Sequence, residues 1–241
     1  MSAAAAPVVG AVVAAEGNGV VGDAIAYLND PLSWTGPGGI LELGREHLAL
    51  TAAAVLVAAV VALPVGAALG HGRRGGGVTV WLTNASRAVP TLGIILLLAT
   101  AGLFGDGATV VAAALFAVPV LLVNTYEGVR GADPSARDAA IGLGMPGRQV
   151  LTRVELPLAT GLVAAGVRTA VVQVSATVPL AALAGGGGLG QIIALGMGTQ
   201  RYGQVLAGGL LVAALALVLD GVFAVVQHVV TPAPLRAAAR R

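Results

Sequence analysis

The chain has 241 residues, of which 57% are hydrophobic and 10% are charged, and its mean hydropathy is +0.91. A soluble domain carries about 25% charged residues, so this composition excludes an ordinary water-soluble enzyme. The net charge of +2 is too small to indicate a nucleic-acid partner. The sequence therefore predicts an all-α integral membrane protein, with the lipid bilayer as its surroundings.

The residue types that are missing exclude several kinds of chemistry. All 13 basic residues are Arg, and the chain contains neither Lys nor Cys. A Lys-based phosphate loop, lysine catalysis and thiolate chemistry are therefore excluded. The histidines His47, His71 and His228 are far apart and lack metal-ligand spacing, so we interpret them as interfacial. We expect no catalytic residue, no metal and no cofactor in this chain.

The apolar segments predict about five transmembrane helices. A spanning helix needs about 20 mostly apolar residues, and five stretches qualify, near 48–69, 78–101, 109–129, 158–183 and 205–230. We therefore divide the chain into an extracytoplasmic N-terminal segment (1–45), a transmembrane domain (46–230) and a basic tail (231–241). The apolar run Pro7–Ala15 is too short to span a membrane and is a candidate interfacial helix.

The distribution of arginines predicts the orientation. One set of loops contains only Arg45 and Arg201, whereas nine arginines lie in the other loops and the tail: Arg73, Arg74, Arg130, Arg137, Arg148, Arg153, Arg236, Arg240 and Arg241. Because positive charge is retained on the cytoplasmic side, the arginine-rich side is predicted to be cytoplasmic. The N-terminus is then outside and the C-terminus inside, which requires an odd number of spans.

The loop 131–157 carries the signals of a short helix. Asp133 can cap a helix that has Pro134 at its first position, and Gly144 is a typical stop after it. Inside this helix, four residues with i, i+3, i+4, i+7 spacing form a narrow apolar face: Ala136, Ala139, Ala140 and Leu143. A helix so short is marginal in water on its own, so we predict that it binds in a groove of another protein.

The same loop resembles the EAA loop of ABC importer permeases, E-A-A-x3-G-x9-I-x-L-P. Here the pattern reads Asp138-Ala139-Ala140, three residues, Gly144, nine residues, then Val154-Glu155-Leu156-Pro157. The two departures, Asp for Glu and Val for Ile, keep the charge and the apolar character. The resemblance implies a type I ABC importer permease fold whose coupling helix docks onto a separate cytoplasmic ATPase dimer. It assigns this coupling to Asp138, Ala139, Ala140, Leu143, Gly144 and Pro157.

A narrower resemblance covers about residues 34–220. It is to the osmoprotectant permeases of the ProW and ProZ type, which import glycine betaine, choline or carnitine across the bacterial inner membrane. The segments that carry it are Glu46-His47-Leu48, Leu63–Gly66, Arg87–Leu92, Asn124–Gly128, Val154–Leu158, Gly166–Ala170 and Gly187–Gly190, with Ser33–Pro37 most like the ProZ branch. Val123 departs from the family, which often has Arg there. The resemblance implies two further partners, an extracytoplasmic substrate-binding protein and a second permease that is identical or homologous. Methionine permeases share the loop, so another small solute remains an alternative substrate.

Two charged residues lie within predicted spans. Arg168 and Asp220 are each about ten residues from the cytoplasmic face, which places both about 15 Å deep. We predict that they form an ion pair, because pairing offsets the cost of burial; the alternative is that each meets water or backbone carbonyls separately. A weakly selective substrate path is predicted along Asn124, Thr125, Gln173 and Thr177.

The run of glycines at 185–190 has no strand before it, so we interpret it as a hinge or a close backbone approach and not as a nucleotide loop.

Two other protein classes are alternatives to the permease. An ion-coupled secondary transporter would need an ion site in the membrane, for which Asp220 is the available acid. An intramembrane protease would need two carboxylates or a Ser–His pair, and we expect no His at the depth of Ser175.

Overall fold

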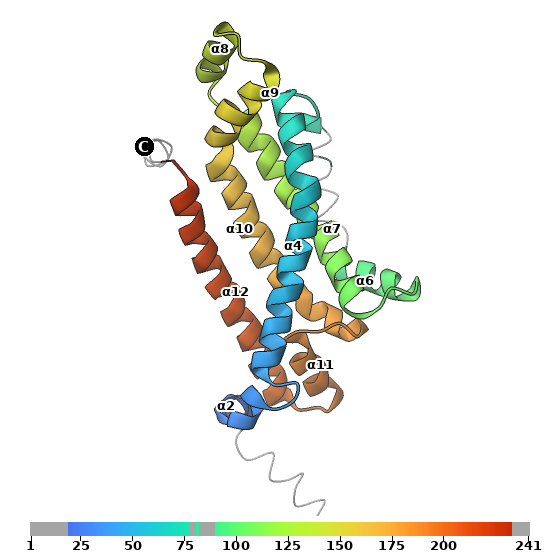
Figure 1. Cartoon of the computed structure of the whole chain (residues 1–241). Coiled ribbons are helices and arrows are strands. Elements are labelled where there is room, and N and C mark those ends of the chain that lie inside the picture. The colour runs from blue at the N-terminus through green and yellow to red at the C-terminus, as the bar shows by residue number, and fades with distance from the viewer. Residues whose placement is uncertain (1–18, 78–80, 82–89, 233–241) are drawn as a thin grey trace, which may run out of the picture.

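The computed structural model describes residues 19–77, 81 and 90–232, and all regular secondary structure in those ranges is helical. The body of the molecule consists of long helices that run side by side: α4 (Ile40–His71), α7 (Gly105–Arg130), α10 (Leu156–Ala181) and α12 (Tyr202–Val230) (Figure 1). Short helices α8 (Pro134–Gly142) and α9 (Gly147–Val150) lie at one end of this bundle. The opposite end carries α2 (Gly19–Asn29), α3 (Pro31–Thr35) and α11 (Gly190–Gly198). The all-α fold predicted from the sequence is confirmed.

Four helical stretches in the described ranges are long and apolar enough to cross a membrane. They are Pro31–His71, Gly105–Arg130, Gly147–Ala184 and Tyr202–Val230, and they contain the first, third, fourth and fifth spans predicted from the sequence. In the second predicted span, near 78–101, the structure describes a shorter apolar helix, α6 (Thr91–Thr100). Residues 78–80 and 82–89 of that span lie outside the described residues.

Helix α4 starts earlier than the sequence analysis placed it. It begins at Ile40 instead of residue 48, because Gly39 caps it and the inward-facing positions Ile40, Leu43 and His47 already follow helical spacing. Its 32 residues give a length of about 48 Å, against a hydrocarbon thickness of about 30 Å. The ends of α4 therefore extend beyond the hydrocarbon layer.

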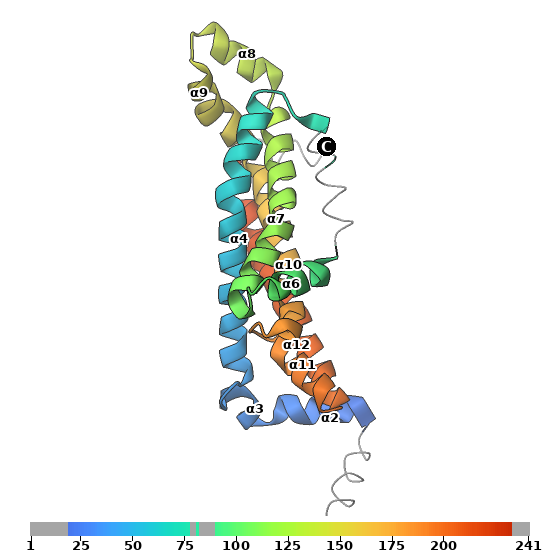
Figure 2. The same ribbon diagram turned by 90° about the vertical axis from the view of Figure 1, so that its right-hand side faces the viewer.

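Helix α2 lies across the end of the bundle and packs against α12 (Figure 2). This crosswise direction is that of a helix lying in a membrane interface. The predicted interfacial helix at Pro7–Ala15 lies outside the described residues.

The contact between α4 and α7 is built from small side chains. Buried small residues recur at every fourth position of α4: Ala54, Ala58, Ala62, Gly66 and Gly70. A Cβ atom at Gly66 would lie 2.8 Å from the carbonyl oxygen of Leu122 and 2.9 Å from Cβ of Thr125. Small residues at this spacing let two helix backbones approach closely, and the resulting van der Waals contact holds helices together in lipid.

We predict that Gly66→Leu destabilises the bundle, because the new side chain overlaps the backbone of α7. Overpacking of this kind costs about 1–3 kcal/mol, so the midpoint of thermal unfolding in detergent should fall. Gly44→Leu is the matched control on the same helix, since a Cβ there meets nothing within 4 Å. Equal unfolding midpoints for the two variants would contradict this account of the α4–α7 contact.

Candidate functional site

Helix α8 has a defined beginning and a defined end. Oδ1 of Asp133 accepts a hydrogen bond of 2.9 Å from the backbone N–H of Ser135, and Pro134 is the first helical residue. At the other end, the N–H of Gly144 donates to the carbonyl of Ile141 and the N–H of the next residue donates to that of Ala140. This is a Schellman motif, in which the residue after the cap adopts a left-handed conformation. Gly144 has a φ of +78°, so the stop at this residue has a backbone cause.

The predicted apolar face of α8 is only partly covered by the chain itself. Ala140 is buried, whereas Asp138 and Ala139 are exposed. Leu143 is 80% exposed and Ile141 is 49% exposed. Helix α8 and its C-terminal cap Leu143 thus expose two large apolar side chains and one carboxylate.

Pro157 shapes the junction between this loop and α10. The helix directly before it is a π-turn, η2 (Leu151–Glu155), in which the N–H of Leu156 donates to the carbonyl of Leu151. Proline has no N–H for the carbonyl of Arg153, and its ring would clash with that carbonyl in a regular α-helix. The wider turn accommodates the proline and sets the direction of Glu155.

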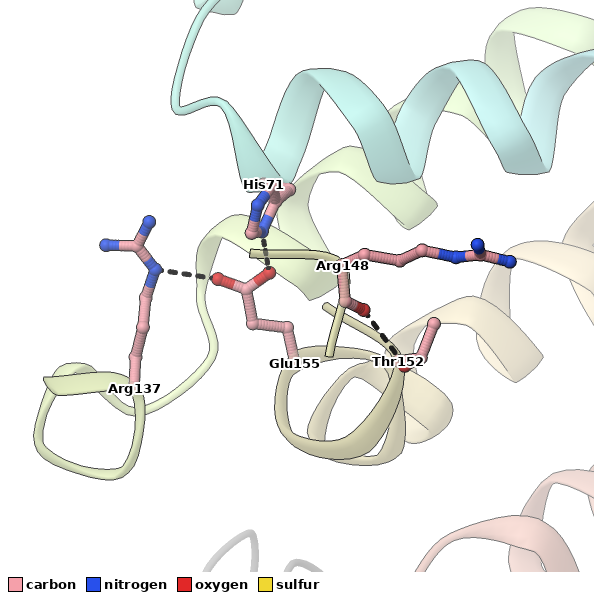
Figure 3. Close-up of polar contacts among 5 residues, drawn as sticks. All are labelled: His71, Arg137, Arg148, Thr152 and Glu155. Atoms are coloured by element: carbon pink, nitrogen blue, oxygen red, sulfur yellow. Dashed lines mark hydrogen bonds and ion pairs between the residues drawn. The ribbon is translucent and has the colours of Figure 1, made fainter. Parts of the chain in front are cut away.

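Glu155 is a buried carboxylate with two side-chain partners, an arrangement that was not predicted from the sequence (Figure 3). Its side chain is 2% exposed, and its Oε2 lies 2.5 Å from Nδ1 of His71 at the end of α4. Its Oε1 accepts a hydrogen bond of 2.8 Å from Nε of Arg137 on α8. A buried carboxylate is costly unless it is paired, and here it has two partners. In the sequence, Glu155 stands out only as one position of the loop pattern, and His71 is predicted to be interfacial.

Arg168 and Asp220 lie together between α10 and α12. Nε and Nη2 of Arg168 each donate a hydrogen bond of 2.6 Å to one carboxylate oxygen of Asp220, which is the bidentate geometry of a strong charged pair. The two side chains are 34% and 39% exposed. They line a groove of about 540 Å³ together with Thr169, Gln173 and Gln227. Charged side chains in membrane helices usually pair with one another and face the bundle interior or a water-filled path.

The four predicted path residues do not share one surface. Gln173 lies on the groove beside Arg168. Thr125 and Thr177 are buried, and their hydroxyls donate to backbone carbonyls one turn earlier in their own helices. The side-chain amide of Asn124 donates to its own helix in the same way. Within one chain, only Gln173 of this set therefore opens onto the groove.

The glycine run makes a close backbone approach, which was one of the two expected interpretations. The N–H of Gly187 donates to Oδ1 of Asp106 at 3.1 Å, and the N–H of Gly188 donates to Oε2 of Glu46 at 2.8 Å. A Cβ atom at Gly187 would overlap the carboxylate of Glu46. The loop is thus held to both α4 and α7 at the end of the bundle opposite α8 (Figure 1).

The expectation that no His lies near Ser175 is wrong. His47 is fully buried, with Nε2 at 3.0 Å from the carbonyl oxygen of Ser175 and 3.3 Å from its Oγ. The early start of α4 brings His47 inside the bundle, and the interfacial interpretation of this residue is wrong for the same reason. Nδ1 of His47 has no hydrogen-bond partner, so the carboxylate of a Ser–His–Asp triad is absent here.

A membrane bundle with a capped helix exposed at its arginine-rich end and a charged groove between two spans has the architecture of a transport subunit. The family model described as binding-protein-dependent transport system inner membrane component matches residues 39–231. The chain belongs to this family of ABC transporter permeases, whose members are not themselves catalytic.

Similar proteins with curated names are osmoprotectant permeases. The glycine betaine/carnitine/choline transport system permease protein OpuCB of Bacillus subtilis is 32% identical over 84% of this chain and 93% of its own length. The osmoprotectant import permease protein OsmW of Salmonella typhimurium is 29% identical over 89% of this chain and 100% of its own. Among solved structures, an inward-facing MetNI methionine ABC transporter is similar in fold, with a TM-score of 0.71, 21% identity, and coverage of 85% of this chain and 100% of that chain.

We predict that the pair of Arg168 and Asp220 contributes to folding through its charges. Arg168→Ala and Asp220→Ala each leave one charge without its partner and should lower the yield of monodisperse protein in detergent. The charge-exchanged double variant should recover that yield, whereas Thr169→Val, which changes a neutral groove residue, should leave it unchanged. A double variant no better than either single variant would argue against the pairing.

We also predict that Gly187→Ala releases the glycine loop, because the added methyl group displaces the Glu46 carboxylate. Loss of a hydrogen bond to a charged group is worth about 1.5–3 kcal/mol, so amides of residues 185–190 should exchange with deuterium roughly tenfold faster or more. Gly198→Ala, where a Cβ meets nothing within 4 Å, is the control. Unchanged exchange in Gly187→Ala would show that the loop does not depend on these bonds.

Proposed function

We propose that this chain is the permease subunit of an ATP-driven importer for quaternary-ammonium osmoprotectants such as glycine betaine, choline or carnitine. Membership of the permease family supports the transport role. Similarity over most of the chain to permeases named for these solutes supports the substrate class. The ATP is hydrolysed by a separate subunit.

Helix α8 is the observation that carries this proposal. It is short, firmly capped and exposes Ile141 and Leu143, which suits insertion into a cleft of a cytoplasmic ATPase dimer. Asp138, Ala139 and Gly144 lie on the exposed part of the loop, whereas Ala140 packs against the chain itself. The arginine-rich end that carries α8 is then cytoplasmic, the N-terminus is extracytoplasmic and the C-terminus is cytoplasmic.

The groove between α10 and α12 supports a path shared with a second permease. An ion pair that is about one-third exposed would be costly if it faced lipid. The ion pair avoids lipid if a second copy of this chain, or a homologous permease, packs beside it so that the two grooves face each other around an aqueous path. Gln173 then lines the path next to the ion pair.

The selective step is assigned to an extracytoplasmic binding protein. Quaternary ammonium groups are recognised best over aromatic faces, and only 3% of this chain is aromatic. The permease path is then weakly selective, and the binding protein delivers the substrate to the end that carries the glycine loop.

The test is uptake of labelled glycine betaine into liposomes that contain this chain, its ATPase, the binding protein and any sister permease. Uptake should require internal ATP, and competition by choline, carnitine or methionine should rank the substrates. Uptake driven by a proton or sodium gradient without the ATPase would overturn the proposal in favour of a secondary transporter. ATP-dependent uptake of methionine but not of betaine would overturn the substrate class alone.

A variant of the loop tests the docking site. We predict that Gly144→Trp abolishes uptake, because a bulky side chain is strained at a φ of +78° and projects at the docking surface. Gly144→Asn is the matched control, since Asn tolerates the left-handed conformation, and it should retain most of the uptake. Wild-type uptake by Gly144→Trp would count against docking at this turn.

A further inference from the structure

Helix α8 has little apolar contact with its own chain. It contains nine residues, of which Ala140 is the buried one. It packs against α9 and η2, both of them short elements of the same loop. An isolated helix of this length is not stable in water. Its position relative to the bundle therefore depends strongly on the bond between Arg137 and Glu155.

Glu155 is well placed to connect α8 with two membrane helices. It is the last residue of the π-turn that continues directly into α10, so its carboxylate moves with that helix. A π-turn holds more residues than the 3.6 of an α-helical turn, and each additional residue changes the direction of the following side chains by about 100°. The turn that Pro157 requires is thus also what directs Glu155 toward the end of α4.

His71 completes the connection. It is the last residue of α4, and its Nδ1 meets Glu155 while its other ring nitrogen, Nε2, faces the start of α9. A Cβ atom at Gly147 would lie 3.3 Å from that Nε2, so the ring is enclosed from the loop side. Figure 3 shows the carboxylate of Glu155 between His71 and Arg137, which approach it from different elements.

We propose that Glu155 is a positioning residue that transmits movement of α8 to α10 and α4 through its bonds to Arg137 and His71. When an ATPase displaces α8, the ion pair between Arg137 and Glu155 has two possible fates. It can break, which is costly because it leaves a buried carboxylate with one partner fewer, or it can hold, in which case Glu155 moves with α8 and carries α10 and α4 with it. This inference rests on the proposed function, because it assumes that an ATPase moves α8.

The experiment measures substrate imported per ATP hydrolysed in the reconstituted complex, together with the amount of ATPase that co-purifies. Glu155→Gln should keep the ATPase bound and hydrolysis active but lower the imported substrate per ATP about tenfold, because the amide keeps the size of the side chain and removes the negative charge between Arg137 and His71. A role limited to folding would lower co-purification and leave the ratio of the surviving complexes unchanged.

Conservative variants distinguish the effect of losing a hydrogen bond to Glu155 from the effect of changing the size of the side chain. Arg137→Lys and His71→Asn keep a donor toward Glu155, so the substrate imported per ATP should stay near the wild-type value. Arg137→Leu and His71→Leu remove the donor and should lower the substrate imported per ATP as Glu155→Gln does. Arg148→Leu is the control, since Arg148 is an exposed arginine of the same loop whose guanidinium points away from Glu155 in Figure 3.

The outcomes distinguish the two proposals. Absence of ATP-dependent uptake in the wild type overturns the proposed function and this inference together. Normal wild-type uptake with unchanged ratios in Glu155→Gln and Arg137→Leu overturns the inference alone. If Glu155→Gln does not assemble with the ATPase, Arg137→Lys and Arg137→Leu are compared instead. Equal amounts of substrate imported per ATP by these two variants overturn the inference.

Discussion

The close approach of α4 and α7 is the constraint on which the other features depend. Small residues at every fourth position of α4 allow backbone atoms of α7 to touch it, as at Gly66 and Gly70. In lipid no hydrophobic force drives helices together, so such contact has to supply the attraction. Because this contact fixes the position of α4 along α7, it also determines what lies next to each end of α4. Glu46 lies beside the glycine loop, and His71 lies beside Glu155.

Charged side chains join separate elements at three levels along the bundle. At the end opposite α8, carboxylates of α4 and α7 hold backbone amides of the glycine loop. Between the two ends of the bundle, a bidentate ion pair joins α10 to α12. At the end that carries α8, a buried carboxylate joins α4, α8 and the start of α10. A chain with only 10% charged residues thus places several of them where helices must be held in a defined relation.

The features that the sequence predicted well are those with local causes. The bounds of α8 follow from Asp133, Pro134 and Gly144, which act within one or two turns. His47 and Ser175 are 128 positions apart in sequence, and their contact depends on how α4 and α10 are aligned along the bundle, which the lengths of the apolar segments do not determine. Thr125 and Thr177 were predicted to line a path, but each hydroxyl already donates to a backbone carbonyl of its own helix. Their sequence positions do not reveal this bond. Glu155 was missed because its π-turn arises from a proline two residues later, and the alignment with His71 appears only in three dimensions.

The bidentate pair between α10 and α12 also has a consequence for biogenesis. Synthesis runs from the N-terminus, so α10 with Arg168 is made before α12 with Asp220. Helix α12 buries few of its residues against the rest of the chain, and the apolar stretch that would cross the membrane buries none. Asp220 raises the cost of inserting this helix alone. An arginine already present on α10 lowers that cost, so pairing with Arg168 favours insertion of the last helix beside α10.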